Sequence, residues 1–177
     1  MARLHELGKD HPIEDAVRTG LVGKDFYEQS PEACRYLLWN YEEHLAKSLG
    51  SAATVDEHER RQIWKVRASD SVEHVFPQNP GTGNGWDDRM RGEDGVAKPI
   101  REHVGRIGNL LLLPAPLNSE AKALPFDAKK AIYAKHNLRM VQEVCSESDW
   151  SLTEIERREA SIVDWAKVRW ADIQRSG

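Results

Sequence analysis

The sequence has few cysteines, no long apolar run and no glycine-rich loop of the phosphate-binding type. Its only cysteines, Cys34 and Cys145, are too few for a disulfide framework or a four-thiolate zinc site, and they fit a reducing cytoplasm. The longest apolar stretches, such as 110–113 (LLLL), have the length of a strand, and the N-terminus lacks a continuous apolar segment. We therefore expect no membrane span and no secretory signal. The run 81–85 (GTGNG) lacks the lysine of a nucleotide-binding loop and predicts a turn.

Charge is distributed unevenly along the chain. The 177 residues carry a net charge of −4, yet the segment 98–139 holds 8 basic and 3 acidic side chains. Because local charge sets the field that a phosphate backbone meets, this segment favours contact with nucleic acid. Chance clustering of lysine and arginine explains the same numbers, so charge alone leaves both interpretations open.

Hydrophobic spacing and helix-start signals predict a mostly helical chain. Residues 30–32 (SPE) combine a capping hydroxyl, a proline and an acid, and apolar residues follow at spacings of three and four as far as Leu49. A charged helix is expected over 55–66. The capping-box spacing of 151–154 (SLTE) predicts the start of a long C-terminal helix.

Two short strands are expected, at 71–77 (SVEHVFP) and at 107–113 (IGNLLLL). The segment between them, 78–96, contains five glycines and predicts a functional or mobile loop. Prolines 114 and 116 should end the second strand. Further short helices are predicted over 99–106, from Asn118 and over 127–135.

Four polar residues in this region are candidates for chemistry. Glu73 and His74 are adjacent near the end of the first expected strand, where a bend in the chain would let both address one site. Asn109 lies among the apolar residues of the second strand, and a buried amide there requires hydrogen-bond partners. Asn118 follows nine residues later, at an expected helix start.

Each candidate also has a purely structural interpretation. A single histidine in a strand is usually structural. Asn118 fits a helix cap, and Asn109 fits a turn residue beside a glycine. His103 is best interpreted as a helix-end residue without a chemical role.

The order and spacing of these residues resemble the HNH, or ββα-metal, nuclease finger. That pattern places acid-His-hydrophobic-x-Pro on one strand, Asn on the returning strand and Asn or His at the next helix. The closer similarity is to the nuclease domain at the C-terminus of GmrSD-type modification-dependent restriction enzymes and related phage-defence proteins, including those that sense phosphorothioated DNA. The similar stretches are 72–78 (VEHVFPQ), 103–113 (HVGRIGNLLLL), 117–133 (LNSEAKALPFDAKKAIY) and 155–165 (IERREASIVDW).

The resemblance implies a role for each candidate, and the chemistry of the side chains agrees with it. His74 is the expected general base near neutral pH. Glu73 and Asn118 offer hard oxygen ligands for one Mg²⁺ or Mn²⁺ ion. Asn109 is grouped with the catalytic residues because its amide would brace the loop that carries His74. The cations predicted to contact DNA phosphates are Lys129, Lys130, Arg106 and Lys122.

We therefore expect an α+β fold, with a mostly helical body around a two-stranded HNH finger. Residues 1–70 would form a helical lead-in, and residues 71–177 would form the nuclease domain with its C-terminal helix. The resemblance implies that both belong to a larger protein with an upstream ParB-like, nucleotide-hydrolysing domain that senses modified DNA. The implied activity is metal-dependent nicking of DNA that leaves 5′-phosphate and 3′-hydroxyl ends.

Two alternatives remain open at this point. One is a non-catalytic DNA-binding or regulatory domain that retains the HNH scaffold. The other is a helical protein-interaction domain. The acidic overall charge gives weight to both.

Overall fold

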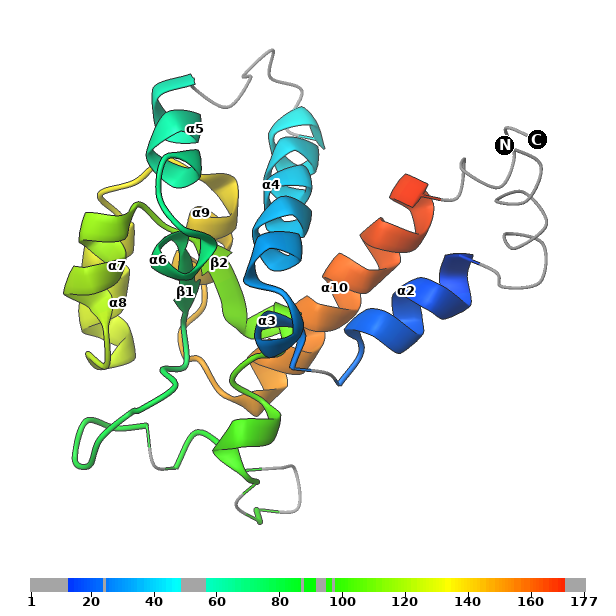
Figure 1. Ribbon diagram of the computed structural model, residues 1–177. Helices are drawn as coiled ribbons and strands as arrows, with labels where there is room; N and C mark the ends of the chain where they lie inside the picture. The colour runs from blue at the N-terminus through cyan, green and yellow to red at the C-terminus, as the bar shows by residue number, and fades with distance from the viewer. Residues whose placement is uncertain are drawn as a thin grey trace, which may run out of the picture.

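The computed structural model describes residues 13–23, 25–48, 57–86, 88–91, 95–96 and 98–170 (Figure 1). The α-helices are α2 (Ile13–Leu21), α3 (Phe26–Gln29), α4 (Pro31–Ser48), α5 (Glu57–Trp64), α6 (Ala68–Ser71), α7 (Ala115–Ala121), α8 (Phe126–Tyr133), α9 (Arg139–Cys145) and α10 (Leu152–Trp170). The 3-10 helices are η1 (Ile100–Glu102) and η2 (Ile107–Asn109), and the strands are β1 (Val72–His74) and β2 (Leu110–Leu112). The expected mostly helical α+β fold is confirmed. Within these residues, no helix is long and apolar enough to cross a membrane.

A two-stranded antiparallel sheet lies at the centre of the fold. In its register His74 is opposite Leu110 and Glu73 is opposite Leu111. In Figure 1 the sheet lies between α4 and the α7–α8 pair, and every residue of both strands is buried. Burial on both faces explains why β2 is a continuous leucine run without polar alternation.

Helix α4 begins as the sequence predicts. The Ser30 hydroxyl accepts a hydrogen bond from the Ala33 backbone N–H at 3.2 Å, and Pro31 is the first helical residue. The helix also carries a buried carboxylate, Glu42, which accepts bonds from the backbone N–H groups of Arg139 (2.8 Å) and Met140 (2.9 Å). Glu42 therefore caps α9 and ties it to α4.

The predicted start of the C-terminal helix is also confirmed. The Glu154 carboxylate accepts bonds from the Ser151 backbone N–H (2.8 Å) and from its hydroxyl (2.5 Å), and α10 follows. This helix packs against η2 at very close range. A Cβ atom on Gly108 would lie 2.0 Å from the carbonyl oxygen of Ile155, so only glycine fits there.

The close approach of α10 explains why the second predicted strand is wrong in its first half. Residues 107–109 form η2, and Arg158 of α10 donates from Nη1 to the carbonyls of Gly108 (2.9 Å) and Leu110 (2.7 Å). A side chain of the packed helix thus binds carbonyls that the prediction assigned to a strand. Of the predicted strand 107–113, only Leu110–Leu112 (β2) is extended in the sheet.

Several predicted boundaries also shift. The first strand is shorter than 71–77, and the helix predicted over 99–106 reduces to η1. Helix α7 begins at Ala115, with Pro114 as its N-cap residue and Pro116 in its first turn, so the prolines start a helix as well as ending a strand. The predicted helix start at Asn118 is therefore wrong. The predictions for residues 49–51 and for 55 and 56 lie outside the described residues.

The described part of segment 78–96 contains no helix and neither strand of the sheet, in agreement with the predicted loop. Gly81, Gly83 and Gly85 have φ values of 72°, 75° and 81°, which other residues rarely adopt. The loop is nonetheless anchored, because Trp86 is fully buried and its Nε1 donates to the carbonyl of Leu124 at 3.0 Å. The anchor fixes the loop beside the turn between α7 and α8.

The contact between Gly108 and α10 predicts a sharp effect of one methyl group. Gly108→Ala should lower the free energy of unfolding by at least about 2 kcal/mol. The new Cβ would clash with backbone atoms of α10, and rotation of a side chain does not relieve such a clash. The matched control is Gly20→Ala in α2, where the new Cβ meets no atom within 4 Å apart from those of its chain neighbours and its own helix backbone. The control should be neutral or stabilising by up to about 1 kcal/mol. Urea unfolding of both variants measures the difference, and equal midpoints would contradict the packing.

Candidate active site

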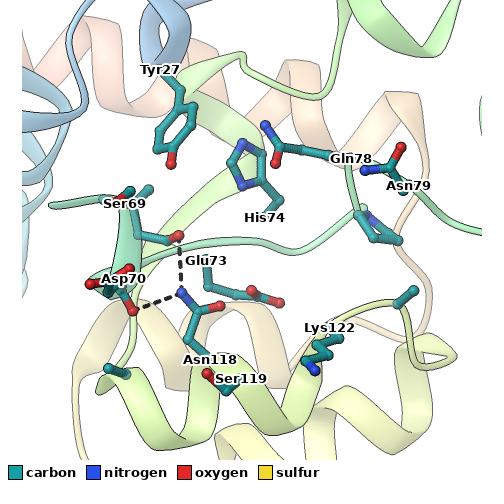
Figure 2. A pocket seen from close by; sticks show the side chains of 14 residues that line it. Tyr27, Ser69, Asp70, Glu73, His74, Gln78, Asn79, Asn118, Ser119 and Lys122 are labelled. Atoms are coloured by element: carbon teal, nitrogen blue, oxygen red, sulfur yellow. Dashed lines mark hydrogen bonds between the residues drawn. The ribbon is translucent and has the colours of Figure 1, made fainter. Parts of the chain in front are cut away.

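One cleft of about 570 Å³ brings together residues from α3, α6, β1 and α7 (Figure 2). The predicted residues that line it are Glu73, His74, Asn118 and Lys122. The other lining residues are Tyr27, Ser69, Asp70, Val72, Pro77, Gln78, Asn79, Ala115, Ser119 and Ala123. The cleft therefore joins residues far apart in the sequence, and it includes one from the N-terminal region.

His74 ends β1 and is buried, with 7% of its surface exposed. Its Nε2 atom is buried without a hydrogen-bond partner. Burial and, to a lesser extent, the positive charge of Lys129 together lower the pKa of His74 to about 3. The imidazole is therefore neutral at physiological pH, the protonation state that a general base requires.

Glu73 lies beside His74 in β1, and its carboxylate binds to α8. Its Oε1 atom accepts a bond from Lys129 Nζ at 2.6 Å and another from the Tyr133 hydroxyl at 2.8 Å. Burial raises the pKa of Glu73, and the charge of Lys129 opposes that rise. Lys129 also donates to the carbonyl of His74 at 2.8 Å, so one ammonium holds both residues of the strand end.

The four cations predicted to contact phosphate have different positions. Lys122 is exposed and lines the cleft. Lys129 is fully buried, and its ammonium is bound to Glu73. Arg106 pairs with Glu159 at 2.6 Å, and Lys130 donates to the Glu147 carbonyl at 3.1 Å. Of the four, the structure brings only Lys122 to the cleft.

Asn118 lies inside α7, and its Nδ2 donates to the carbonyls of Asp70 (3.0 Å) and Val72 (3.2 Å). These two bonds fix the amide and turn its oxygen toward the side of the Glu73 carboxylate, as Figure 2 shows. The alternative role of Asn118 as a helix cap is wrong, because α7 begins three residues earlier with Pro114 at the N-cap.

Asn109 does not line the cleft but binds the chain just after His74. Its Oδ1 accepts bonds from the Phe76 N–H (2.8 Å) and from Trp150 Nε1 (3.0 Å). Its Nδ2 donates to the carbonyls of Phe76 (2.9 Å) and Val104 (2.8 Å). The amide is fully buried, and both its oxygen and its nitrogen make two hydrogen bonds. Asn109 thus holds the backbone that follows the histidine.

Comparison with known proteins matches residues 11–165 to the family model for the C-terminal domain of GmrSD restriction endonucleases. The chain belongs to this family. No curated protein and no solved structure matches significantly. The match includes α3 and α4, so both the N-terminal helices and the strand end with Glu73 and His74 lie within the family domain.

The cleft of this GmrSD C-terminal domain has oxygen donors that suit a small divalent cation. Oxygens of Glu73 and Asn118 face the same part of the cleft, and both are hard ligands. Over the ranges described, no three His, Cys, Asp or Glu side chains are grouped as metal ligands. An ion here would therefore complete its shell with water and substrate oxygens, as Mg²⁺ usually does.

Two aromatic residues of the site were not predicted. Tyr27 lines the cleft from α3, and Tyr133 hydrogen-bonds to Glu73 from α8. Tyr133 stands in a stretch that carries the family resemblance, where its spacing of four residues from Lys129 places both on one helix face. No sequence signal links Tyr27 to His74, because their contact depends on how α3 packs on the sheet.

The Asn109 contacts predict a large loss of stability on truncation. Asn109→Ala should lower the free energy of unfolding by about 3 kcal/mol or more, because four buried polar groups lose their partners. Asn137→Ala, at an exposed position, is the matched control and should change stability by less than about 0.5 kcal/mol. Chemical denaturation measures the free energy of unfolding of both variants. A loss of less than about 1 kcal/mol in Asn109→Ala would be inconsistent with the four hydrogen bonds of Asn109.

The low pKa of His74 predicts that acid destabilises the fold. Below an unfolded-state pKa of 6.5, the unfolded chain binds a proton that the buried imidazole rejects until about pH 3. The free energy of unfolding should therefore fall as pH drops from 6.5, by up to about 1.4 kcal/mol per pH unit from this group. Unfolding curves of wild type and His74→Phe between pH 5 and 7 measure the contribution. Equal pH slopes for the two proteins would show that the imidazole is not buried.

Proposed function

We propose that this domain is a metal-dependent DNA endonuclease that nicks one strand within a modification-dependent restriction or phage-defence system. The observation that carries the proposal is the cleft that brings His74 together with Glu73 and Asn118, where His74 is neutral at physiological pH. A general base needs an unprotonated nitrogen within reach of a water molecule. The family to which the chain belongs is named for restriction endonucleases, which supports DNA as the substrate.

In the proposed reaction, His74 accepts a proton from the water that attacks the scissile phosphorus. The bond from phosphorus to the 3′ oxygen breaks and the leaving oxygen takes up a proton from solvent, which leaves a 5′-phosphate and a 3′-hydroxyl. A Mg²⁺ or Mn²⁺ ion held by Glu73 and Asn118 would supply positive charge against the charge that develops on the phosphate oxygens. Because one cleft holds one such base, a monomer is expected to cut one strand.

Surrounding residues hold these groups in place. Lys129 and Tyr133 bind Oε1 of Glu73, which leaves the other carboxylate oxygen to address a metal ion. The carbonyls of Asp70 and Val72 fix the Asn118 amide in the same way. Lys122 is exposed at the cleft, where its ammonium suits a DNA phosphate.

The resemblance to GmrSD-type proteins supports a further part of the proposal. An upstream ParB-like, nucleotide-hydrolysing domain would sense the DNA modification and deliver the substrate. Phosphorothioate and glucosylated hydroxymethylcytosine both fit the resemblance.

One observation favours a second candidate, a non-catalytic DNA-binding domain that retains the HNH scaffold. The ion pair of 2.6 Å between Glu73 and Lys129 uses one oxygen of the carboxylate that the nuclease proposal assigns to a metal. A domain of this kind would retain DNA in a salt-dependent way without forming a cleaved product.

The test is nicking of supercoiled plasmid, unmodified and modified, in Mg²⁺ or Mn²⁺. Wild type should convert supercoiled to open-circular DNA, and excess chelator should stop the reaction. His74→Ala should lower the rate by about a hundredfold or more, because a general base contributes at least that factor. The matched control is His58→Ala, at an exposed position of α5, which should leave the rate unchanged.

Equal cleavage by wild type and His74→Ala would refute the assigned base. Cleavage in excess chelator would refute the metal requirement. DNA retention without any product would establish the second candidate. Absence of both retention and product at low salt would support a protein-interaction domain instead.

A further inference from the structure

The ring of Tyr27 packs against the ring of His74. Their centroids lie 4.6 Å apart at an interplanar angle of 83°, an edge-on contact. Figure 2 shows Tyr27 beside the imidazole, with Gln78 near the ring on another side. Tyr27 comes from α3, more than forty residues before the strand that carries the histidine.

Packing is what orients this imidazole. A functional histidine is usually oriented by a hydrogen bond from its second ring nitrogen. For the residues that the structure describes, no hydrogen bond to the His74 ring is found, and Nε2 is buried without a partner. The edge-on tyrosine therefore restricts rotation of the ring where a hydrogen bond would otherwise do so.

Helix α3 is fixed to the turn before η2, which places Tyr27 accurately. The backbone N–H groups of Phe26 and Tyr27 both donate to the carbonyl of Gly105, at 3.0 and 3.3 Å. The fit at Gly105 is tight, because a Cβ atom there would lie 1.8 Å from Oδ1 of Asp25. The same Oδ1 accepts a bond from the Glu28 N–H at 2.8 Å and caps α3.

Asn109 connects this turn to the histidine. Its Nδ2 donates to the carbonyls of both Val104 and Phe76, one residue before Gly105 and two residues after His74. One buried amide therefore sets the distance between the turn that holds α3 and the chain that holds the base. Tyr27 and His74 are aligned through a continuous set of short backbone contacts.

We propose that Tyr27 is a positioning residue, which holds the His74 imidazole in the orientation that its role as base requires. This inference rests on the proposed nuclease function. It makes α3 part of the active site, although the sequence predicts only a helical lead-in over residues 1–70. The aromatic ring supplies the effect, and the tyrosine hydroxyl takes no part in it.

The test compares Tyr27→Phe and Tyr27→Leu in the full chain. Tyr27→Phe keeps the ring and should retain at least half of the wild-type kcat for plasmid nicking. Tyr27→Leu removes the ring and should lower kcat by about ten- to a hundredfold, because a small misplacement of a reacting group is costly. KM should stay within twofold in both variants, since neither changes a charged group of the cleft. Tyr36→Leu, at an exposed position of α4, is the matched control and should behave as wild type.

Nuclear magnetic resonance supplies a readout independent of cleavage. The ring protons of His74 should shift in Tyr27→Leu, because the neighbouring aromatic ring is gone, and should stay near their wild-type positions in Tyr27→Phe. If the thermal midpoint of Tyr27→Leu falls below the assay temperature, Tyr27→Met replaces it. Methionine also lacks the ring but keeps most of the volume of the tyrosine side chain. These spectra remain informative if wild type does not cut DNA, so failure of the nuclease proposal is separable from failure of this one.

Three outcomes would overturn the proposal. Unchanged kcat and unchanged His74 resonances in the ring-deleted variant would show that the contact has no effect. An equal loss in Tyr27→Phe would assign the effect to the hydroxyl. A change in KM alone would make Tyr27 a contact for DNA.

Discussion

The site depends most on the four hydrogen bonds of the buried Asn109 amide. They tie together the chain after His74, the turn that holds α3 and the indole of Trp150 near the start of α10. A fully buried amide is stable only when all its polar atoms are paired, and these partners are fixed backbone groups and one ring nitrogen. These hydrogen bonds therefore give the chain after His74, and with it the imidazole, a defined position.

A second network holds Glu73 and the end of β1. Glu73 is held by Lys129 and Tyr133 from α8, and the same lysine binds the carbonyl of His74. Burial of an ion pair costs free energy that is recovered only with additional hydrogen bonds. Two such bonds are present here, from the Tyr133 hydroxyl to Glu73 and from Lys129 to the His74 carbonyl. The strand end is thus bound by both Asn109 and Lys129, and the adjacent residues Glu73 and His74 line one cleft.

Much of the fold could be predicted because its signals are local. The starts of α4 and α10 rest on capping groups within three residues of each helix, and both predictions are confirmed. The strand at 107–109 was wrong because its outcome depends on α10, which approaches Gly108 to within contact distance only in the folded chain. The sequence predicts a helix start at Asn118 because prolines stop strands, whereas Pro116 lies in the first turn of α7.

The site was predictable in part for the same reason. The order of Glu73, His74, Asn109 and Asn118 in the sequence is enough to suggest a nuclease finger, and three of the four line one cleft. Burial is not visible in a sequence, so Lys129 was predicted to meet phosphate although its ammonium is bound by Glu73. The contact of Tyr27 with His74 depends on a backbone carbonyl at Gly105, which no sequence motif reports.

The central claim is that a divalent ion binds at Glu73 and Asn118, within a few ångströms of the His74 ring. Paramagnetic broadening by Mn²⁺ tests it directly, because the ion broadens resonances in a strongly distance-dependent way. Substoichiometric Mn²⁺ should erase the ring signals of His74 and leave those of His58, an exposed residue of α5, in place, and Asn118→Ala should weaken the effect. Persistence of the His74 signals at a full equivalent of Mn²⁺, or equal broadening of both histidines, would contradict the account.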